Sequence, residues 1–272
     1  MRVTLLGTGD TAGTPVPGCD CPTCQRATEL GVERSRFSVH VENEATGESL
    51  LVDASPDMRS QFLDREVPLP QEAIITHVHF DHLDGLGNAY RLVSQLDVHA
   101  ADERDPHTGE SVADTVSRRY DYLDRVDVFP ETPYDPFEAA GFEVTLVPVD
   151  HPPILCYGLL IRDEHSKLAI TGDTSFGIPE RSRHALAGAD LLLADGILPA
   201  TACEHHPLGG RHENEDGIPR TFGTKHMTRE GAVDLAAELA ADRFRIVHAS
   251  HRYPVEEAFA DEIAVDGERF DL

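Results

Sequence analysis

The stretch Thr76–His82, with the sequence THVHFDH, holds three histidines and one aspartate and directly follows the apolar run Ala73–Ile75. If that run is a strand that continues into the motif, alternate side chains share a face, so His77 and His79 should point the same way. The last two residues of the motif should then follow at the carboxyl end of the strand. Imidazole and carboxylate groups are ligands for zinc and other first-row divalent ions. The spacing therefore favours a site for two neighbouring metal ions over a run of surface histidines.

Three further apolar runs end at a residue that is able to bind a metal. The runs and the residues that follow them are 142–149 with His151, 168–172 with Asp173, and 244–247 with His248. Each run is predicted to be a strand because it is short, apolar and rich in β-branched residues. One short segment cannot enclose two metals, so these residues are expected to complete the site.

This set of residues resembles the metallo-β-lactamase superfamily of binuclear hydrolases over nearly the whole chain. The resemblance implies an α/β fold, a four-layer αββα sandwich with the metals at the strand edge between the two sheets. It also implies that Asp53, after the run Leu50–Val52, supports the site without binding metal. The implied ligands are His77, His79 and His151 for the first metal, Asp81, His82 and His248 for the second, and Asp173 as the bridge. Every ligand position is filled, so an active enzyme is expected.

Three of the five cysteines, Cys19, Cys21 and Cys24, lie within six residues in the Gly- and Pro-containing loop 14–26. Thiolates this close cannot all form disulfides without strain, whereas tetrahedral zinc accepts them. His251, three residues after His248, is a candidate fourth ligand. The alternative is a loop of reduced cysteines without metal.

The cysteine loop and the HxxH pair together resemble the PhnP-type phosphodiesterases, in which such a zinc is structural. We therefore assign His248 to the active site and His251 to the structural zinc, although the sequence also permits the reverse. The expected cofactors are two divalent ions, zinc or manganese, in the active site and one structural zinc.

His226 lies just before the helical run 229–241, with Thr228 as the expected N-cap. It resembles the histidine that phosphodiesterase branches of the superfamily, including tRNase Z, place near the scissile phosphate as a proton donor. The resemblance thus gives catalytic roles to His226, as general acid, and to Asp81, which would orient the attacking hydroxide. The alternative is an ordinary histidine near a helix start.

The composition is strongly acidic, with 49 acidic against 23 basic residues and a formal net charge of −26. Such a chain repels itself in dilute salt, and its composition is typical of an organism that keeps molar salt in its cytoplasm, such as a halophilic archaeon. The charge argues against a nucleic-acid partner, although high salt also weakens attraction to phosphates. There is no long apolar run for a membrane span, and residues 1–6 are predicted to be a strand and not a signal peptide. The reduced, clustered cysteines fit the cytoplasm.

The pattern along residues 1–272 indicates one hydrolase domain. Strands are expected near 2–6, 36–42, 49–53, 73–77, 97–100, 142–149, 156–162, 167–172, 191–195 and 244–248. Helices are expected near 57–65, 83–93, 109–119, 179–187 and 229–241. Segment 199–224 is rich in Pro, Gly and His and is longer than an ordinary connection. We interpret it as a lid over the substrate, with a mobile insertion as the alternative.

The leading hypothesis is a cytoplasmic phosphodiesterase that hydrolyses a small, cyclic phosphate diester, and the resemblance implies 5-phosphoribosyl 1,2-cyclic phosphate. A tRNase Z-like nuclease would need an RNA-binding arm and a basic surface, which are not evident. A PqqB-like cofactor-biosynthesis protein shares the cysteine loop but usually departs at the active-site ligands. A non-catalytic metal-binding protein would not need His226. The expected partner is a small-molecule substrate, and a homodimer is left open.

Overall fold

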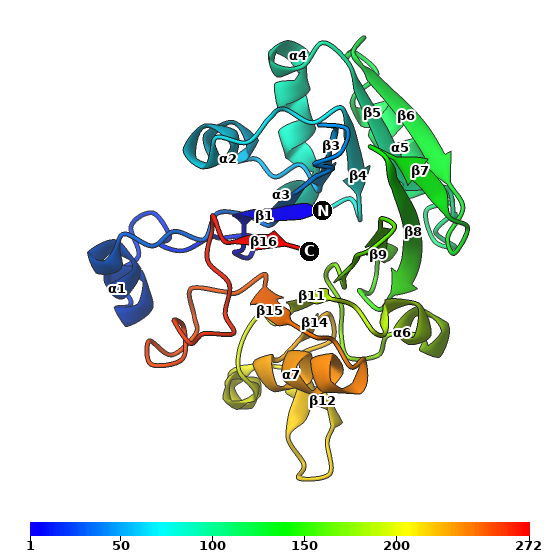
Figure 1. Ribbon diagram of the computed structural model, residues 1–272. Coiled ribbons are helices and arrows are strands. Elements are labelled where there is room, and N and C mark those ends of the chain that lie inside the picture. The colour runs from blue at the N-terminus through cyan, green and yellow to red at the C-terminus, as the bar shows by residue number, and fades with distance from the viewer.

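Two β-sheets pack face to face in the computed structural model, which describes residues 1–272, and helices cover both outer surfaces (Figure 1). The predicted four-layer αββα sandwich is therefore confirmed. The first sheet has seven strands in the order β16-β1-β2-β3-β4-β5-β6. Their bounds are Arg269–Asp271 (β16), Arg2–Gly7 (β1), Ser38–Glu42 (β2), Ser49–Val52 (β3), Glu72–Ile75 (β4), Leu96–Ala101 (β5) and Val126–Glu131 (β6).

The second sheet has six strands in the order β15-β11-β10-β9-β8-β7. Their bounds are Phe244–Val247 (β15), Leu191–Asp195 (β11), Lys167–Ile170 (β10), Cys156–Arg162 (β9), Phe142–Val149 (β8) and Phe137–Ala139 (β7). Strands β10, β11 and β15 are parallel, and β8 runs in the same direction because β9 is antiparallel to both β8 and β10. In the first sheet β3 and β4 are parallel. The carboxyl ends of each of these groups of strands therefore meet at one edge of their sheet.

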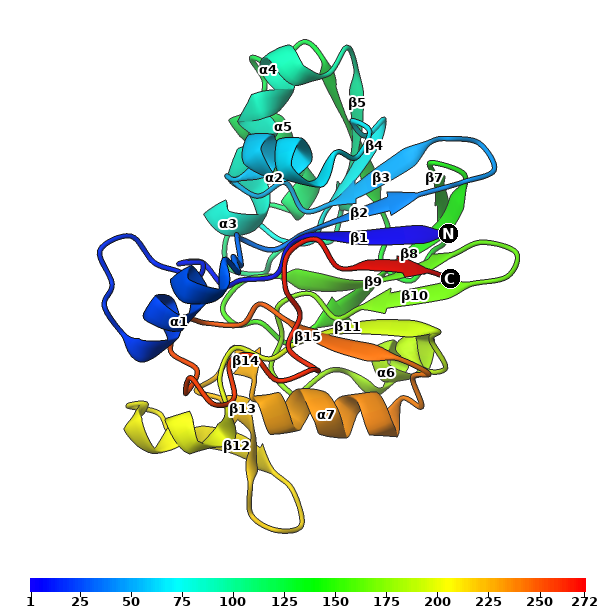
Figure 2. The same cartoon turned by 60° about the vertical axis from the view of Figure 1, so that its left-hand side comes forward.

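The helices lie outside the two sheets (Figure 2). In chain order they are Pro22–Leu30 (α1), Met58–Arg65 (α2), Phe80–Leu83 (α3), Ala89–Leu92 (α4), Val112–Arg119 (α5), Glu180–Leu186 (α6) and Arg229–Glu238 (α7), with 3₁₀ turns at Asp84–Asn88 (η1) and Ala200–His205 (η2). Helix α5 packs on β5 and β6, whereas α7 packs on β11 and β15. No helix combines the length and apolarity that a membrane crossing requires.

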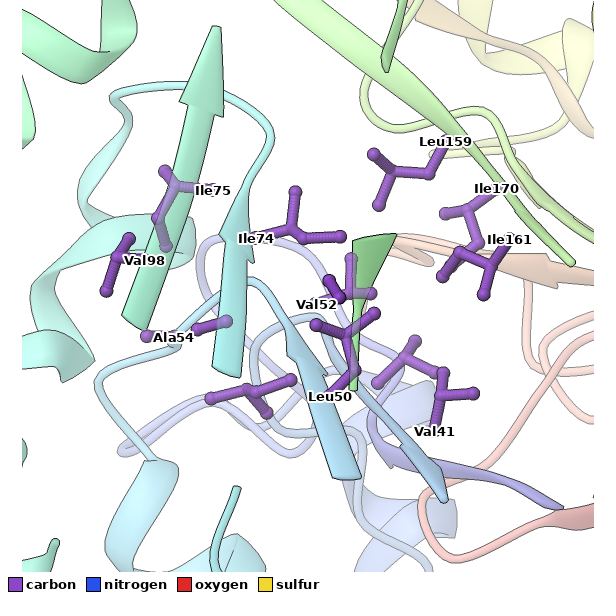
Figure 3. Close-up of a cluster of buried hydrophobic side chains, with 14 of the residues drawn as sticks. Val41, Leu50, Val52, Ala54, Ile74, Ile75, Val98, Leu159, Ile161 and Ile170 are labelled. Carbon is purple, nitrogen blue, oxygen red and sulfur yellow. The ribbon is translucent and has the colours of Figure 1, made fainter. Parts of the chain in front are cut away.

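The core between the sheets is built from alternating strand residues. Val52 and Ile74 of the first sheet face Leu159 and Ile170 of the second, while Ile75 points to the opposite face of its sheet (Figure 3). All five side chains are fully buried. Burial of such a side chain contributes roughly 1.5–3 kcal/mol, so this layer holds the strand ends that carry the site in fixed positions.

Two predicted elements around the motif 76–82 were wrong in their bounds. Strand β4 ends at Ile75, two residues before the predicted end, so strand alternation does not align His77 with His79. The predicted helix 83–93 is instead α3, η1 and α4, and α3 already begins inside the motif. Gly85 in η1 lies against the backbone of Ser55. A Cβ atom added at Gly85 would lie only 2.0 Å from the carbonyl oxygen of Ser55. This close approach packs η1 tightly against the backbone of Ala54 and Ser55, just after β3.

Several elements were not predicted. They are α1, β6, β7, β16 and the three short strands Gly210–Glu213 (β12), Pro219–Phe222 (β13) and His226–Met227 (β14). Helix α1 starts inside the cysteine loop 14–26, so Cys24 lies in its first turn. Strands β12, β13 and β14 form a small sheet of their own. The β12–β13 hairpin extends away from the two large sheets (Figures 1 and 2), and its role as a lid stays a prediction.

Candidate metal centre and active site

Three imidazole nitrogens converge where β4 and β8 end. His77 Nε2 lies 3.1 Å from His79 Nδ1, which lies 3.3 Å from His151 Nε2. Four-coordinate zinc with Zn–N bonds of ~2.05 Å separates its nitrogen ligands by about 3.3 Å. With Asp173 these residues form one group whose ligand atoms all lie within 4.8 Å of one another. Their spacing fits a single divalent ion.

A second group consists of Asp81, His82 and His248. Asp81 Oδ2 lies 3.8 Å from His82 Nε2 and 3.7 Å from His248 Nε2. Both of these imidazole nitrogens are buried, and neither has a hydrogen-bond partner. Buried polar atoms without partners are costly, and a second divalent ion at this position would satisfy both. The donor set therefore fits a metal here as well.

Asp173 lies between the two groups. Its Oδ2 is 3.7 Å from His77 Nε2 in the first group and 3.4 Å from both His82 Nε2 and His248 Nε2 in the second. One carboxylate thus faces both sets of nitrogens, which is the arrangement that a bridging ligand requires.

Hydrogen bonds fix the orientation of the ligands. Asp53 Oδ2 lies 2.6 Å from His82 Nδ1, and the Asp53 carboxylate also accepts from the backbone and hydroxyl of Thr76, both at 2.8 Å. His151 Nδ1 lies 3.0 Å from the carbonyl oxygen of Lys225. Such bonds to the outer ring nitrogen leave the inner nitrogen for the metal. Asp53 therefore orients His82 without belonging to either ligand group of the proposed metal pair.

The pKa shifts separate the two groups of histidines. Burial lowers the pKa of His77 well below its usual range and that of His151 to about 3, which keeps these rings neutral. For His248 burial acts in the same direction, but Asp173, Asp81 and Asp195 outweigh it and raise the pKa to about 9. The carboxylates near His248 thus attract positive charge, and a bound cation would take the place of the proton.

The cysteine cluster has the spacing of a tetrahedral site. The Sγ atoms of Cys19, Cys21 and Cys24 each lie 3.6 Å from His251 Nδ1. With Zn–S of ~2.3 Å and Zn–N of ~2.05 Å, a tetrahedral zinc predicts a sulfur-to-nitrogen distance of about 3.6 Å. The structure thus places His251 with the cysteines and His248 with the active-site ligands, so the reverse arrangement that the sequence left open is not the one observed.

His226 lies beside both groups of ligands. Its ring centroid is 4.9 Å from that of His151 and 5.0 Å from that of His248. Its Nδ1 lies 2.9 Å from Oδ2 of Asp195, a buried residue at the end of β11. Asp195 was predicted to lie at the end of a strand, and no role in the site was predicted for it. The signal was an aspartate that ends an apolar run, the same pattern that identified Asp53.

A second residue without a predicted role is Thr11, in the loop after β1. Its Oγ1 donates a hydrogen bond to Asp81 Oδ2 at 2.6 Å. This oxygen is the one that faces His82 and His248. Thr11 therefore positions Asp81 at the mouth of the site, where Thr11 itself is exposed.

The residues from Asp53 to His248 fall within one known family. The family described as "Beta-lactamase superfamily domain" matches residues 48–249. The chain belongs to the beta-lactamase superfamily. Members of this fold bind divalent metals and are mostly hydrolases, which agrees with the two groups of ligands.

Two curated relatives match most of the chain. It is 27% identical over 268 residues to an octanoyltransferase of Porphyromonas gingivalis, covering 94% of this chain but 47% of that protein. It therefore spans about half the length of that relative. It is 25% identical to coenzyme PQQ synthesis protein B of Methylobacterium radiotolerans, covering 94% of this chain and 91% of the relative.

Solved structures share the fold along the whole chain. A diphosphatase from the PhnP family has a TM-score of 0.77 and 26% identity, covering 100% of this chain and 97% of that one. Zn²⁺-bound PqqB from Methylobacterium extorquens has the same TM-score with 23% identity and full coverage of both chains. The short form of human tRNase Z has a TM-score of 0.69 and 19% identity, covering 100% and 99% of the two chains. The last two show the fold alone.

Proposed function

We propose that this protein is a binuclear metal-dependent phosphodiesterase that acts on small phosphate diesters. The observation that carries the proposal is the pair of His226 and Asp195 beside the two ligand groups. A metal-assisted hydrolysis with a good leaving group needs no such pair. An ester whose leaving group is a poorly acidic alcohol needs a proton at that oxygen, and a carboxylate-bonded imidazole supplies one.

Each side chain of the proposed site has a separate task. A pair of divalent ions held by the two ligand groups would activate water as the nucleophile and neutralise charge on the phosphoryl oxygens. Asp81, held by Thr11, accepts a hydrogen bond from the attacking water and so directs it. His226 donates a proton from Nε2 to the leaving oxygen, while Asp195 stabilises the ring through Nδ1.

Lys225 supports a phosphate substrate. It is one of only two lysines in a chain with 49 acidic residues. The carbonyl oxygen of Lys225 lies 3.0 Å from His151 Nδ1, so the backbone of this lysine lies at the first ligand group. A cation at this point favours a bound phosphate anion in an otherwise negative protein.

The proposed substrate is small, and 5-phosphoribosyl 1,2-cyclic phosphate is the first compound to test. The likeness to the PhnP-family diphosphatase makes a small diphosphate the second candidate. A PqqB-like role is supported by the curated relatives but leaves the pair of His226 and Asp195 without a task. An RNA substrate finds little support in a net charge of −26.

The test is a panel of cyclic and linear phosphodiesters and diphosphates, assayed in molar KCl with Zn²⁺ or Mn²⁺. We expect hydrolysis of at least one small diester and its loss in Asp173→Asn, which removes the charge that faces both ligand groups. Asp64→Asn, at an exposed position of α2, is the matched control and should keep activity. The proposal would be abandoned if metal-loaded wild type cleaved none of the diesters.

A further inference from the structure

A cavity of about 240 Å³ lies next to the candidate active site. Two of its walls come from segments that carry ligands of the first group. Val78 stands between His77 and His79, and Ile154 and Leu155 follow His151 by three and four residues. The turn after His151 is closed by a hydrogen bond of 3.2 Å from Ile154 N to His151 O. The cavity is therefore lined in part by residues that are close to His77, His79 and His151 along the chain.

The inner surface of the cavity is apolar. Val78, Ile154 and Leu155 are half-buried, and Val112 at the start of α5 is buried. Val78 and Leu155 also pack against the main core, so these walls are held in place. Ligand pockets commonly measure ~300–1,000 Å³. A cavity of about 240 Å³ thus suits one ring of a substrate better than a whole substrate.

The charged groups at the rim are already paired or capped. Glu110 Oε2 binds Arg118 Nη2 at 2.9 Å, and Asp105 Oδ1 accepts from the backbone of His107 and Thr108 at 2.7 and 2.9 Å. The rim thus carries the carboxylates of Glu110 and Asp105 and the guanidinium of Arg118. Its net charge is negative, and its one cation is already paired with Glu110. An anionic group is disfavoured here, whereas an uncharged ring fits the apolar walls.

We infer that this cavity is a substrate subsite that binds an uncharged ring esterified to the scissile phosphate. The inference rests on the proposed phosphodiesterase function and narrows it. A sugar or nucleoside ester that presents an uncharged ring fits the cavity, whereas a ring with a further phosphate would meet the Glu110 and Asp105 carboxylates. The subsite thus changes the order of the candidate substrates: 5-phosphoribosyl 1,2-cyclic phosphate should be hydrolysed, but less well than the same cyclic ribose phosphate without the 5-phosphate.

Three diesters with one leaving group test the subsite, namely methyl, phenyl and 4-carboxyphenyl 4-nitrophenyl phosphate. Because 4-nitrophenolate leaves in each case, ratios of kcat/KM report binding of the other ester group and cancel differences in active enzyme. Wild type should prefer phenyl over methyl by at least about tenfold, the range that one buried apolar group contributes to specificity. Leu155→Trp fills the cavity and should bring that ratio towards one. Leu63→Trp, the matched control at an exposed position of α2, should keep it.

The charge of the rim is tested with the same compounds. Wild type should have a lower kcat/KM for the 4-carboxyphenyl ester than for the phenyl ester. Glu110→Gln frees Arg118 and should raise the ratio of the first kcat/KM to the second several-fold. Glu143→Gln is the control because Glu143 also pairs with an arginine, Arg162, at 3.9 Å on the exposed surface. The subsite is refuted if Leu155→Trp keeps the wild-type ratio or if wild type prefers the anionic ester. Equal hydrolysis of all three esters refutes the subsite alone, whereas hydrolysis of none refutes the proposed function and this inference with it.

Discussion

His226 Nδ1 and Asp195 Oδ2 lie 2.9 Å apart, although the two residues come from separate strands 31 positions apart in the chain. The Asp195 carboxylate also accepts a hydrogen bond from the backbone N–H of Thr174 at 2.9 Å, and Thr174 directly follows the candidate ligand Asp173. This bond fixes the orientation of the carboxylate. An ionised carboxylate on Nδ1 stabilises the protonated ring that a general acid requires. This pair is what separates the candidate site from a plain two-metal centre.

Substitution of His226 should therefore lower the rate most for substrates whose leaving group most needs a proton. His226→Ala should lose ~10²–10⁴-fold in rate on a ribosyl cyclic diester, the usual contribution of general-acid catalysis, and clearly less on an aryl diester. The measurement is kcat/KM on both substrates, with metal content determined alongside. Equal losses on the two substrates would assign His226 to substrate positioning, and a lost metal would make it a ligand.

Asp195→Asn should show the same dependence on the leaving group with a smaller loss. The amide still fits against His226 but no longer carries the charge that stabilises the protonated ring. Single-turnover rates on the same two diesters, measured at equal metal content, check this. A uniform loss on both diesters would mean that Asp195 acts only through the fold.

The cysteine cluster leads to a prediction about metal count. Cys19, Cys21, Cys24 and His251 have the spacing of one zinc site, so wild type should bind three metals per chain and Cys21→Ser should bind two. Because a structural zinc contributes directly to folding, that variant should also melt earlier. Cys203→Ser, at a buried cysteine outside the cluster, is the control and should keep all three metals. Two metals per chain in both wild type and Cys21→Ser would refute the structural zinc.

Four candidate metal ligands, His77, His151, Asp173 and His248, were predictable from sequence because each lies just after a short apolar run. Strands β8, β10 and β15 run in one direction in the second sheet, so His151, Asp173 and His248 follow the same edge. His77 follows β4 of the first sheet and joins them because the two sheets pack face to face. The convergence of His79 with His77 did not come from strand alternation, since β4 ends at Ile75. The residues predicted from sequence do converge in the structure, although the local geometry predicted for His77 and His79 was partly wrong.

The roles of Asp195 and Thr11 could not be predicted from the sequence. Asp195 has the pattern of a residue at a strand exit, but only its contact with His226 gives it a role, and that contact depends on the position of β14. Thr11 is an exposed residue in a loop, and nothing in its neighbours predicts a bond to Asp81. Strands β12 and β13 were also missed, because a Gly- and Pro-rich hairpin has little of the apolar alternation that identifies a strand.

The acidic composition predicts a dependence on salt. With a formal net charge of −26, self-repulsion should weaken the fold at low ionic strength, and screening should relieve it. The melting temperature should therefore rise between about 0.1 M and multimolar KCl, as the Debye length falls from ~10 Å to below ~3 Å. Metal must be held at saturation throughout. A melting temperature that does not change over this range would contradict the expectation.

A buried histidine far from the site predicts a dependence of stability on pH. His99 of β5 lies between two carboxylates, with Nδ1 2.7 Å from Glu131 Oε1 and Nε2 2.8 Å from Glu72 Oε2. Its ring stacks on Phe129 and Phe137, and Phe137 belongs to the second sheet. Burial opposes protonation of His99, but Glu72 and Glu131 outweigh it and raise its pKa above the usual value. The ring, held by Glu72 and Glu131 and stacked on Phe137, thus links the first sheet to the second.

The sign of the effect follows from that shift. A raised pKa in the folded state means that the stabilisation is complete below the pKa of the unfolded chain, ~6.5, and is lost as the pH rises through the higher folded value. The difference in melting temperature between wild type and His99→Gln should therefore be largest near pH ~6 and should shrink towards pH ~9. His184→Gln, at an exposed position of α6, is the control and should follow wild type. If the curves of wild type and His99→Gln ran parallel from pH ~6 to ~9, His99 would not be charged in the folded protein, and the contact between the sheets would not depend on its proton.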